Sequence, residues 1–411
     1  MTPSFIRLET VRGLQSGPLC PYALPYLTLL QEQGYQPKTV REHLCLIASL
    51  NRWLARRDRG LRDLNEQVVL RFLKRHLRRR KHWCGALPAL HRLLGLLRKR
   101  GVTPPAKVIP PTPAQRLADR YRQYLLRERG CADETVENYA RHIDRFLARR
   151  FGSGGVGLAT LRACEVTEFV QRNARDHSPQ QTQQVVTALR SFLRYLHYCG
   201  RVPRDLSSTV PTVAHWRLTG LPKHLPAEAV QRVLDRCEQT SAVGQRNYAI
   251  LLLLARLGLR AGEIVSLRLE DIDWDNANLL IRSRKGRGLA RLPLPADVGQ
   301  AIVRYLKEGR PRCACRNVFI RADAPHVQLS GSPVISCMVM HAIKKAGVAA
   351  PRTGAHVFRH SLATAMLKRG ASLDEIGQVL RHRDPDTTAI YAKVELEALR
   401  PLALPWPGGV R

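Results

Sequence analysis

Apolar residues recur three or four positions apart through most of the chain, with polar residues between them. The pattern is most regular at 89–101 and 188–200, where the apolar positions are Leu90, Leu93, Leu94 and Leu97, and Leu189, Phe192, Leu193 and Leu196. This spacing predicts amphipathic helices that bury one face. Further helices are predicted at 225–236, 248–256, 356–367 and 372–380, the last opened by a capping box of Ser372 and Glu375.

One segment predicts strands instead of helices. Residues 279–281 and 290–294 are aliphatic and flank a basic, glycine-containing turn at 284–288. This arrangement predicts an antiparallel β-hairpin, and it is the clear strand signal of the sequence. The predicted fold is therefore mainly α, with a small antiparallel β-sheet in the C-terminal part.

Two proline-bearing stretches divide the chain. Residues 101–113 contain five prolines and residues 201–226 contain four, and neither composition continues a helix. We therefore expect three units, at 1–103, 114–202 and 222–411.

The first two units are similar to each other. Gly34 and Thr39 in the first correspond to Gly130 and Thr135 in the second, and both pairs are 96 residues apart (130 − 34 and 135 − 39). Each unit also closes on an aliphatic helix. We interpret both as small helical bundles related by duplication. The alternative is that two arginine-rich amphipathic segments resemble each other by composition alone.

Charge indicates the class of partner. The chain has 411 residues, and 67 Lys and Arg against 33 Asp and Glu give a net charge of +34. With 44% hydrophobic residues the chain is typical of a folded protein rather than a disordered one. An excess of this size on a folded protein favours a polyanion, with nucleic acid ahead of a membrane surface. The densest basic run, 75–83, fits phosphate contact, a solvated helix face or a localisation tag.

Membrane, secreted and metal-binding classes have little support in the sequence. The longest aliphatic run, 249–255, is too short to span a bilayer, and residues 1–13 lack the apolar core of a signal peptide. The ten cysteines are scattered without a CxxC pair, which favours a reducing bacterial cytoplasm. Cys313 and Cys315, with His326 nearby, are either loop cysteines or a metal contact, and we expect no metal.

The C-terminal unit resembles the tyrosine recombinase (phage integrase) family, Xer-type enzymes in particular. The resemblance rests on three sequence segments: Leu-Gly-Leu-Arg-Ala-Gly-Glu at 257–263, Arg-His-Ser-Leu-Ala-Thr at 359–364 and Asp-Thr-Thr-Ala-Ile-Tyr at 386–391. The family pattern is Arg, a hairpin Lys, His-x-x-Arg, His or Trp, and Tyr. It falls here on Arg260, Lys285, His356, Arg359, His382 and Tyr391. Residues 114–202 resemble the family's helical, SAM-like core-binding domain.

The resemblance implies a catalytic role for each of these residues. Tyr391 would attack a DNA phosphate and form a 3′-phosphotyrosine bond, which conserves the energy of the backbone bond, so that neither ATP nor a metal is needed. Arg260 and Arg359 would hold the charged non-bridging oxygens of the phosphate. Glu263 is expected to hold Arg260 in place.

The remaining residues would handle protons. Lys285, on the hairpin, is the expected general acid for the departing 5′-oxygen, and His356 the general base or proton relay for Tyr391. His382 would hydrogen-bond the phosphate. His360 is expected to point elsewhere and to be structural.

The resemblance also implies partners. Double-stranded DNA would be held by a homotetramer, and a C-terminal tail at 392–411 would either dock into a neighbouring protomer or pack on its own domain. The additional helical unit at 1–103, which we expect to be a DNA-binding domain, departs from a minimal Xer-type chain and resembles phage- or transposon-borne integrases, which favours integration or excision of a mobile element. The alternatives are a type IB topoisomerase-like enzyme that relaxes DNA and a non-catalytic DNA-binding protein that retains the fold.

Overall fold

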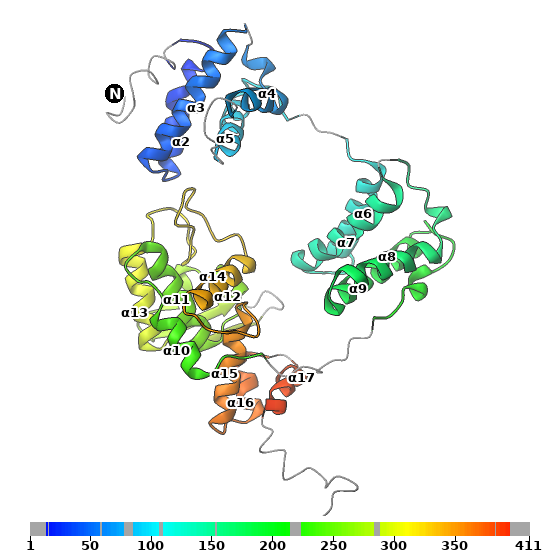
Figure 1. Ribbon diagram of the computed structural model, residues 1–411, viewed down its shortest axis with the longest axis vertical. Helices are drawn as coiled ribbons and strands as arrows, with labels where there is room; N and C mark the ends of the chain where they lie inside the picture. The colour runs from blue at the N-terminus through cyan, green and yellow to red at the C-terminus, as the bar shows by residue number, and fades with distance from the viewer. Residues whose placement is uncertain are drawn as a thin grey trace, which may run out of the picture. The chain divides into compact units, whose positions relative to one another are not determined.

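The computed structural model describes residues 14, 16–57, 60–77, 85–106, 110–152, 154–213, 223–282, 288–382 and 384–394 (Figure 1). The chain divides into two compact units, one of residues 107–219 and one of residues 1–106 together with 220–411. Residues 19–97 and 114–210 each have a hydrophobic core of their own. A third core lies within residues 225–358, and a smaller one within residues 363–391 contains Tyr391. The three-part division predicted from the prolines stays our proposal for the domains.

In the described residues, the N-terminal bundle has four helices and a short 3-10 turn. These are α2 (Cys20–Glu32), α3 (Pro37–Ala55), η1 (Leu61–Asp63), α4 (Glu66–Leu77) and α5 (Ala86–Lys99). Leucines of α5 at 90, 93, 94 and 97 are buried, as their spacing predicts. Inside the bundle the Tyr26 hydroxyl donates to the carbonyl oxygen of Ala89 at 3.0 Å and contacts His43 Nδ1 at 2.9 Å, which ties three helices together.

The second bundle repeats the same order of elements. It contains α6 (Pro113–Arg127), α7 (Asp133–Phe151), η2 (Leu158–Thr160), α8 (Ala163–Asp176) and α9 (Pro179–Tyr198), followed by η3 (Leu206–Thr209). The predicted helix at 188–200 is the C-terminal half of α9, which begins at a capping box of Ser178 and Gln181.

The burial patterns of corresponding helices in the two bundles share many positions. The helices α3 and α7 are both 19 residues long and begin 96 residues apart (133 − 37). At that offset Val40, Ile47 and Leu50 fall on the buried residues Val136, Ile143 and Phe146. For α5 and α9 all six buried positions of α5 fall on buried positions of α9 at an offset of 99. This agreement supports the interpretation that the bundles are copies of one fold.

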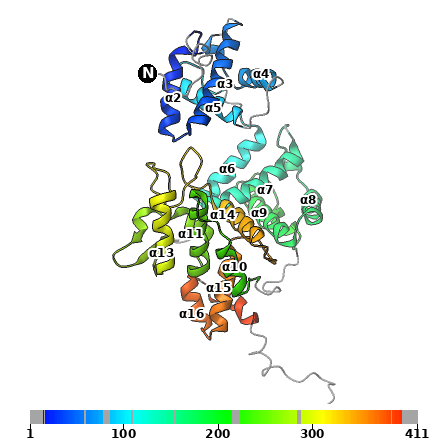
Figure 2. The ribbon, with the colours of Figure 1, turned by 60° about the vertical axis from the view of Figure 1, so that its left-hand side comes forward.

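The C-terminal part combines helices with one small sheet. Its helices are α10 (Ala227–Asp235), α11 (Ala242–Leu257), α12 (Ala261–Ser266), α13 (Ala296–Arg304), α14 (Ser332–Lys345), α15 (His356–Lys368), α16 (Leu373–Leu380) and α17 (Pro385–Thr388). Short 3-10 or π turns are η4 (Leu269–Asp271), η5 (Tyr305–Gly309) and η6 (Ala389–Val394). Most residues of α11 are buried, and the helix packs against α13 and α15. Figure 2 shows α11 beside α13.

The sheet has three antiparallel strands in the order β1 (Ile272–Asp273), β2 (Asn278–Arg282) and β3 (Leu289–Pro293). The predicted hairpin is confirmed, with Leu279 opposite Leu292 and Ile281 opposite Ala290. The two-residue strand β1 is too short to be recognised from its sequence. The capping box of Ser372 and Glu375 at the start of α16 is also confirmed.

Among the described residues, no helix is long and apolar enough to cross a membrane. The same residues contain no group of three or more His, Cys, Asp and Glu side chains placed to hold a metal ion. Cys315 instead donates to the Asn317 side-chain oxygen at 3.5 Å.

Candidate active site

A sharp turn between α11 and α12 positions the first arginine of the motif. Gly258 ends α11 in the left-handed region, with φ of +56°, and a Cβ there would lie 2.8 Å from Leu380 and 3.0 Å from Leu362. The backbone conformation therefore favours glycine, and a Cβ would also have to displace the ends of two leucine side chains. Two residues later, Arg260 is the N-cap of α12, and Glu263 accepts a hydrogen bond from its backbone N–H at 2.9 Å.

Glu263 forms ion pairs with two arginines. Its carboxylate accepts from Arg260 Nη1 at 2.9 Å and from Arg381 Nη2 at 3.0 Å, and the residue is 8% exposed. Burial alone would raise the pKa of Glu263. The backbone N–H of Arg260 and the charges of Arg381 and Arg260 outweigh it and hold this pKa below its ordinary value. The expected contact between Glu263 and Arg260 is confirmed, and Arg381 adds a second cation that we did not predict.

Arg359 reaches the same place from α15. Only 4% of the residue is exposed, and its guanidinium donates to the carbonyl oxygen of Gly258 at 2.5 Å and to that of Leu380. Burial, followed by the charges of Arg260 and Arg381, lowers the pKa of Arg359 to about 9, so it remains cationic at neutral pH. The turn at Gly258 thus positions both motif arginines, because Arg260 follows it in the chain and Arg359 donates to its carbonyl oxygen.

Tyr391 lies in η6, with 1% of its surface exposed. Its hydroxyl is 2.9 Å from His360 Nδ1, and the ring of His382 lies parallel to the tyrosine ring with centroids 6.4 Å apart. Burial raises the pKa of Tyr391 to about 12, against an opposing effect of Arg359. The phenol is therefore protonated at neutral pH, with His360 as a proton acceptor within hydrogen-bond distance.

The histidines around Tyr391 are uncharged at neutral pH. Burial is the largest cause that lowers the pKa of both His360 and His382 to about 4, and Arg359 adds to it in each case. His382 Nδ1 is 2.7 Å from the Thr388 hydroxyl, which fixes the ring and leaves Nε2 for other contacts. His356, one turn before His360 on α15, has its ring centroid 6.4 Å from that of His360.

The structure thus brings together four residues of the sequence motif: Arg260, Arg359, His382 and Tyr391. His356 joins them through His360, whereas Lys285 lies outside the described residues, in the connection between β2 and β3. The expectation that His360 points elsewhere is wrong, because its ring contacts the Tyr391 hydroxyl. The i, i+4 spacing of His356 and His360 places both on one face of α15, and that signal was available in the sequence.

Comparisons with known proteins agree with this geometry. The family model described as "Phage integrase family" matches residues 223–397, and the model described as "Phage integrase, N-terminal SAM-like domain" matches residues 118–198. A Sinorhizobium fredii protein named as integrase/recombinase y4rA is 41% identical over 394 residues, which is 95% of each chain.

Solved structures share the fold. The XerH site-specific recombinase in a post-cleavage complex with its difH substrate has a TM-score of 0.55 at 20% identity, covering 70% of this chain and 84% of that one. A lambda integrase tetramer bound to a Holliday junction has a TM-score of 0.53 at 16% identity, covering 76% of this chain and 87% of that one. Taken together with the near full-length relative, these matches show that the chain belongs to the phage integrase family of tyrosine recombinases.

Proposed function

We propose that this tyrosine recombinase cleaves and rejoins duplex DNA at specific sites through a covalent bond between Tyr391 and a 3′-phosphate. The observation that supports this most directly is the position of the Tyr391 hydroxyl. It lies 2.9 Å from a neutral histidine, in a cluster that contains three arginines and one carboxylate. A phenol with an adjacent base and nearby guanidinium groups is an arrangement suited to attack on a phosphodiester.

The reaction exchanges one phosphate ester for another. The Tyr391 oxygen forms a bond to phosphorus as the bond from phosphorus to the 5′-oxygen breaks, and the phenol proton passes to His360. The 5′-oxygen takes a proton from a general acid, for which Lys285 remains our proposed residue. Because the phosphotyrosine bond is itself a phosphodiester, the reverse attack by a 5′-hydroxyl rejoins DNA without ATP.

The arginines would stabilise the negative charge that develops on the non-bridging oxygens of the phosphate during attack. The side chain of Arg260 is 38% exposed and can meet a DNA phosphate. Arg359 uses two of its five N–H donors on the carbonyl oxygens of Gly258 and Leu380, so that three remain. Donors that are fixed before the phosphate arrives stabilise the transition state without a cost of reorganisation. The free Nε2 of His382 would contribute a further hydrogen bond.

The structure favours His360 over His356 as the group that receives the tyrosine proton. His360 is the histidine within hydrogen-bond distance of the hydroxyl, and its pKa of about 4 keeps it neutral and able to accept. His356 lies one turn further along the same face and is proposed as the relay that exchanges this proton. The two residues thus divide the role that the sequence motif assigns to one.

For the partners, we propose a homotetramer on DNA, which acts on the bacterial nucleoid to integrate or excise a mobile element. The named lambda integrase structure, a tetramer on a Holliday junction, supports the assembly by analogy of fold. The S. fredii relative supports the mobile-element role, because it is named an integrase/recombinase and matches 95% of this chain. The match therefore extends beyond residues 118–397, where the two family models lie.

The test is a suicide substrate. A recognition site selected by the full chain from a pool of random duplexes is nicked beside the cleavage position, so that a short fragment diffuses away and the covalent product accumulates. We expect a protein–DNA adduct on a denaturing gel, and none with Tyr391→Phe. An adduct that persists in Tyr391→Phe would refute the assignment of the nucleophile. Absence of an adduct with the parent would favour a non-catalytic binding protein, and relaxation of any supercoiled plasmid regardless of site would favour the topoisomerase.

A further inference from the structure

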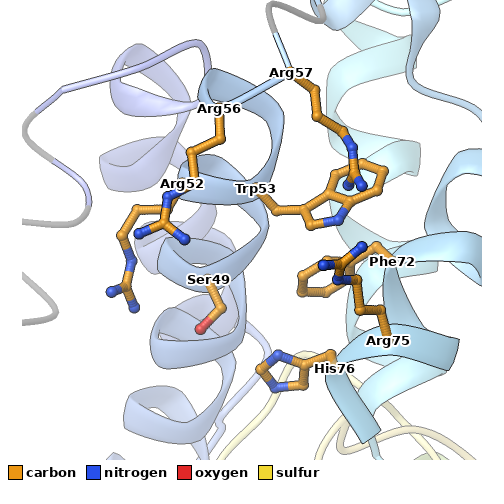
Figure 3. Close-up of a pocket in the computed structure, with 8 residues that line it drawn as sticks. All are labelled: Ser49, Arg52, Trp53, Arg56, Arg57, Phe72, Arg75 and His76. Carbon is orange, nitrogen blue, oxygen red and sulfur yellow. The ribbon is translucent and has the colours of Figure 1, made fainter. Parts of the chain in front are cut away.

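The N-terminal bundle contains a basic pocket that the active site does not use. The pocket lies between α3 and α4 and has a volume of about 430 Å³. Its wall is formed by Trp53 and Phe72, whose rings meet edge to face with centroids 5.7 Å apart. Four arginines line the pocket, and Figure 3 shows Arg57 beside the Trp53 ring and Arg75 beside Phe72, whereas Arg52 and Arg56 extend away from the two rings.

The charges of this pocket are not neutralised within the protein. None of the four arginines forms an ion pair with a carboxylate in the described part of the chain, and all four are exposed. The Arg57 guanidinium lies over the Trp53 ring, 4.5 Å from its centroid. The Trp53 indole N–H is buried there without an acceptor among the described residues. Four exposed cations without carboxylate partners among the described residues suit an anionic ligand, and the indole N–H is one further donor without an acceptor there.

The aromatic wall has a counterpart in the second bundle. There Phe146 meets Phe169 edge to face with centroids 5.2 Å apart, and Phe169 corresponds to Phe72 at the offset of 97 that aligns α8 with α4. The ring pair therefore belongs to the shared helical fold, and what distinguishes the first bundle is the charge around the rings.

Two carboxylates of the second bundle have no counterpart in the first. At the offset of 97 that aligns α4 with α8, Glu165 and Glu168 correspond to Val68 and Arg71. In the second bundle Glu165 pairs with Arg150 at 2.7 Å, and Glu168 pairs with Arg172. The first bundle therefore lacks, on the corresponding face, two carboxylates that pair with arginines in the second, as expected for a surface that binds an anion.

The chemistry of the pocket identifies the anion as a phosphodiester rather than a base edge. Four guanidiniums provide only donors, in planar forks that match phosphate oxygens. A guanidinium fork can also bind the O6 and N7 acceptors of guanine, but only Ser49 and His76 in the lining carry an acceptor for the donor groups of the other bases. The aromatic wall offers an apolar surface to the sugar between successive phosphates. The pocket is thus suited to contact with a DNA backbone that is independent of sequence.

We propose that this arginine pocket is a DNA contact separate from the catalytic unit, which binds the phosphodiester backbone of duplex DNA. The proposal rests on the proposed function in taking duplex DNA as the ligand. It assigns a task to the N-terminal bundle, which neither matching family model covers. The pocket supplies affinity and leaves the choice of sequence to other parts of the protein.

The test uses the full chain carrying Tyr391→Phe, so that binding is measured without covalent chemistry. The pocket variant combines Arg56→Gln, Arg57→Gln and Arg75→Gln, and its affinity for a fluorescent duplex of arbitrary sequence is measured across a range of KCl concentrations. We expect binding to weaken about tenfold or more, and the slope of log K against log [salt] to become shallower by about 2–3.

A matched control removes the same charge from the same bundle. Arg62→Gln, Lys99→Gln and Arg100→Gln are exposed and lie outside the pocket lining. We expect this variant to change the slope by less than about 1. Equal losses in the two variants would attribute the effect to net charge and overturn the proposal, as would an unchanged affinity in the pocket variant.

Trp53 provides a local readout. We expect duplex DNA to quench the tryptophan fluorescence of the parent and the quenching to decrease in Trp53→Phe, which retains a ring against Phe72. Undiminished quenching in Trp53→Phe would overturn the proposal. Adduct formation is measured separately, on the chain with Tyr391 intact. If that chain forms adducts but the pocket variant binds DNA as well as its Tyr391→Phe parent, the pocket proposal alone is refuted. If that chain forms no adduct but the pocket variant loses affinity, the proposed reaction alone is refuted.

Discussion

Replacement of His360 by glutamine tests which histidine activates the nucleophile. The substitution removes a basic nitrogen 2.9 Å from the Tyr391 hydroxyl but keeps a polar side chain of similar length. Because the pKa of Tyr391 is about 12, only about one phenol in 10⁵ is ionised at pH 7 without assistance. A positioned general base typically contributes about 10²–10⁴ in rate, and because a pKa of about 4 makes His360 a weak base at pH 7, we expect His360→Gln to slow adduct formation by about 10², the lower end of that range.

The pH dependence separates His360 from a base with an ordinary histidine pKa. With a pKa of about 4, His360 remains neutral down to about pH 5, and the rate of adduct formation in the parent should change little between pH 8 and pH 5. A base with the ordinary histidine pKa of about 6.5 would be about 76% neutral at pH 7 and about 9% neutral at pH 5.5. Such a base predicts that the rate of adduct formation falls about eightfold between these two pH values.

The assay is single-turnover adduct formation on the nicked duplex, with protein in excess and DNA binding measured in parallel. His356→Gln is the matched control, one turn away on the same helix face, and we expect it to slow the reaction less than His360→Gln does. The assignment of His360 is refuted if His360→Gln reacts at the parental rate. It is equally refuted if the parental rate falls about eightfold between pH 7 and pH 5.5.

Three further substitutions test the support of the site. Glu263→Gln leaves the half-exposed Arg260 and the mostly buried Arg381 without their carboxylate and should lower the stability of the C-terminal unit by about 2–3 kcal/mol in thermal unfolding. Because the pKa of Glu263 is lowered, its contribution is fully present above the ordinary value of 4.5 and is lost as the pH falls through the lower folded-state pKa, so the stability difference between the parent and this variant should shrink as the pH falls from 4.5. Gly258→Ala combines a positive φ with contact against Leu380 and should cost about 2–4 kcal/mol, measured by calorimetry. Thr388→Val removes the hydroxyl bound to His382 and should slow adduct formation about tenfold without changing DNA affinity.

Local patterns predicted those elements whose signals lie within a few residues. The hairpin of β2 and β3, the capping box of α16 and the end of α15 near Gly370 all follow from turn and cap residues adjacent to apolar runs. Helix α14 was missed although Ile335, Val339 and Ile343 are buried at a spacing of four. Its other face also carries apolar side chains, which hides the period that identifies an amphipathic helix.

The contacts of the active site could not be obtained in the same way. The order of the motif residues identified Tyr391, but the histidine that meets it depends on where η6 packs against α15, which is a tertiary relation. Arg381 binds Glu263 across 118 residues of sequence from a left-handed backbone conformation with φ of +54°. No local signal predicts either feature, since arginine rarely adopts that conformation.

The excess of arginine serves two different physical purposes in this chain. In the active site, three guanidiniums face one carboxylate, and with neutral histidines the local charge is about +2, which suits a phosphate that gains negative charge during attack. In the N-terminal pocket, four exposed guanidiniums have no carboxylate partner among the described residues and remain free to adjust to any backbone. Salt screens exposed charges far more than buried ones. Affinity for DNA should therefore fall steeply as salt rises, whereas the rate of adduct formation in a preformed complex should change little. Two such dependences measured on the same protein would separate the arginines that bind DNA from those that act on it.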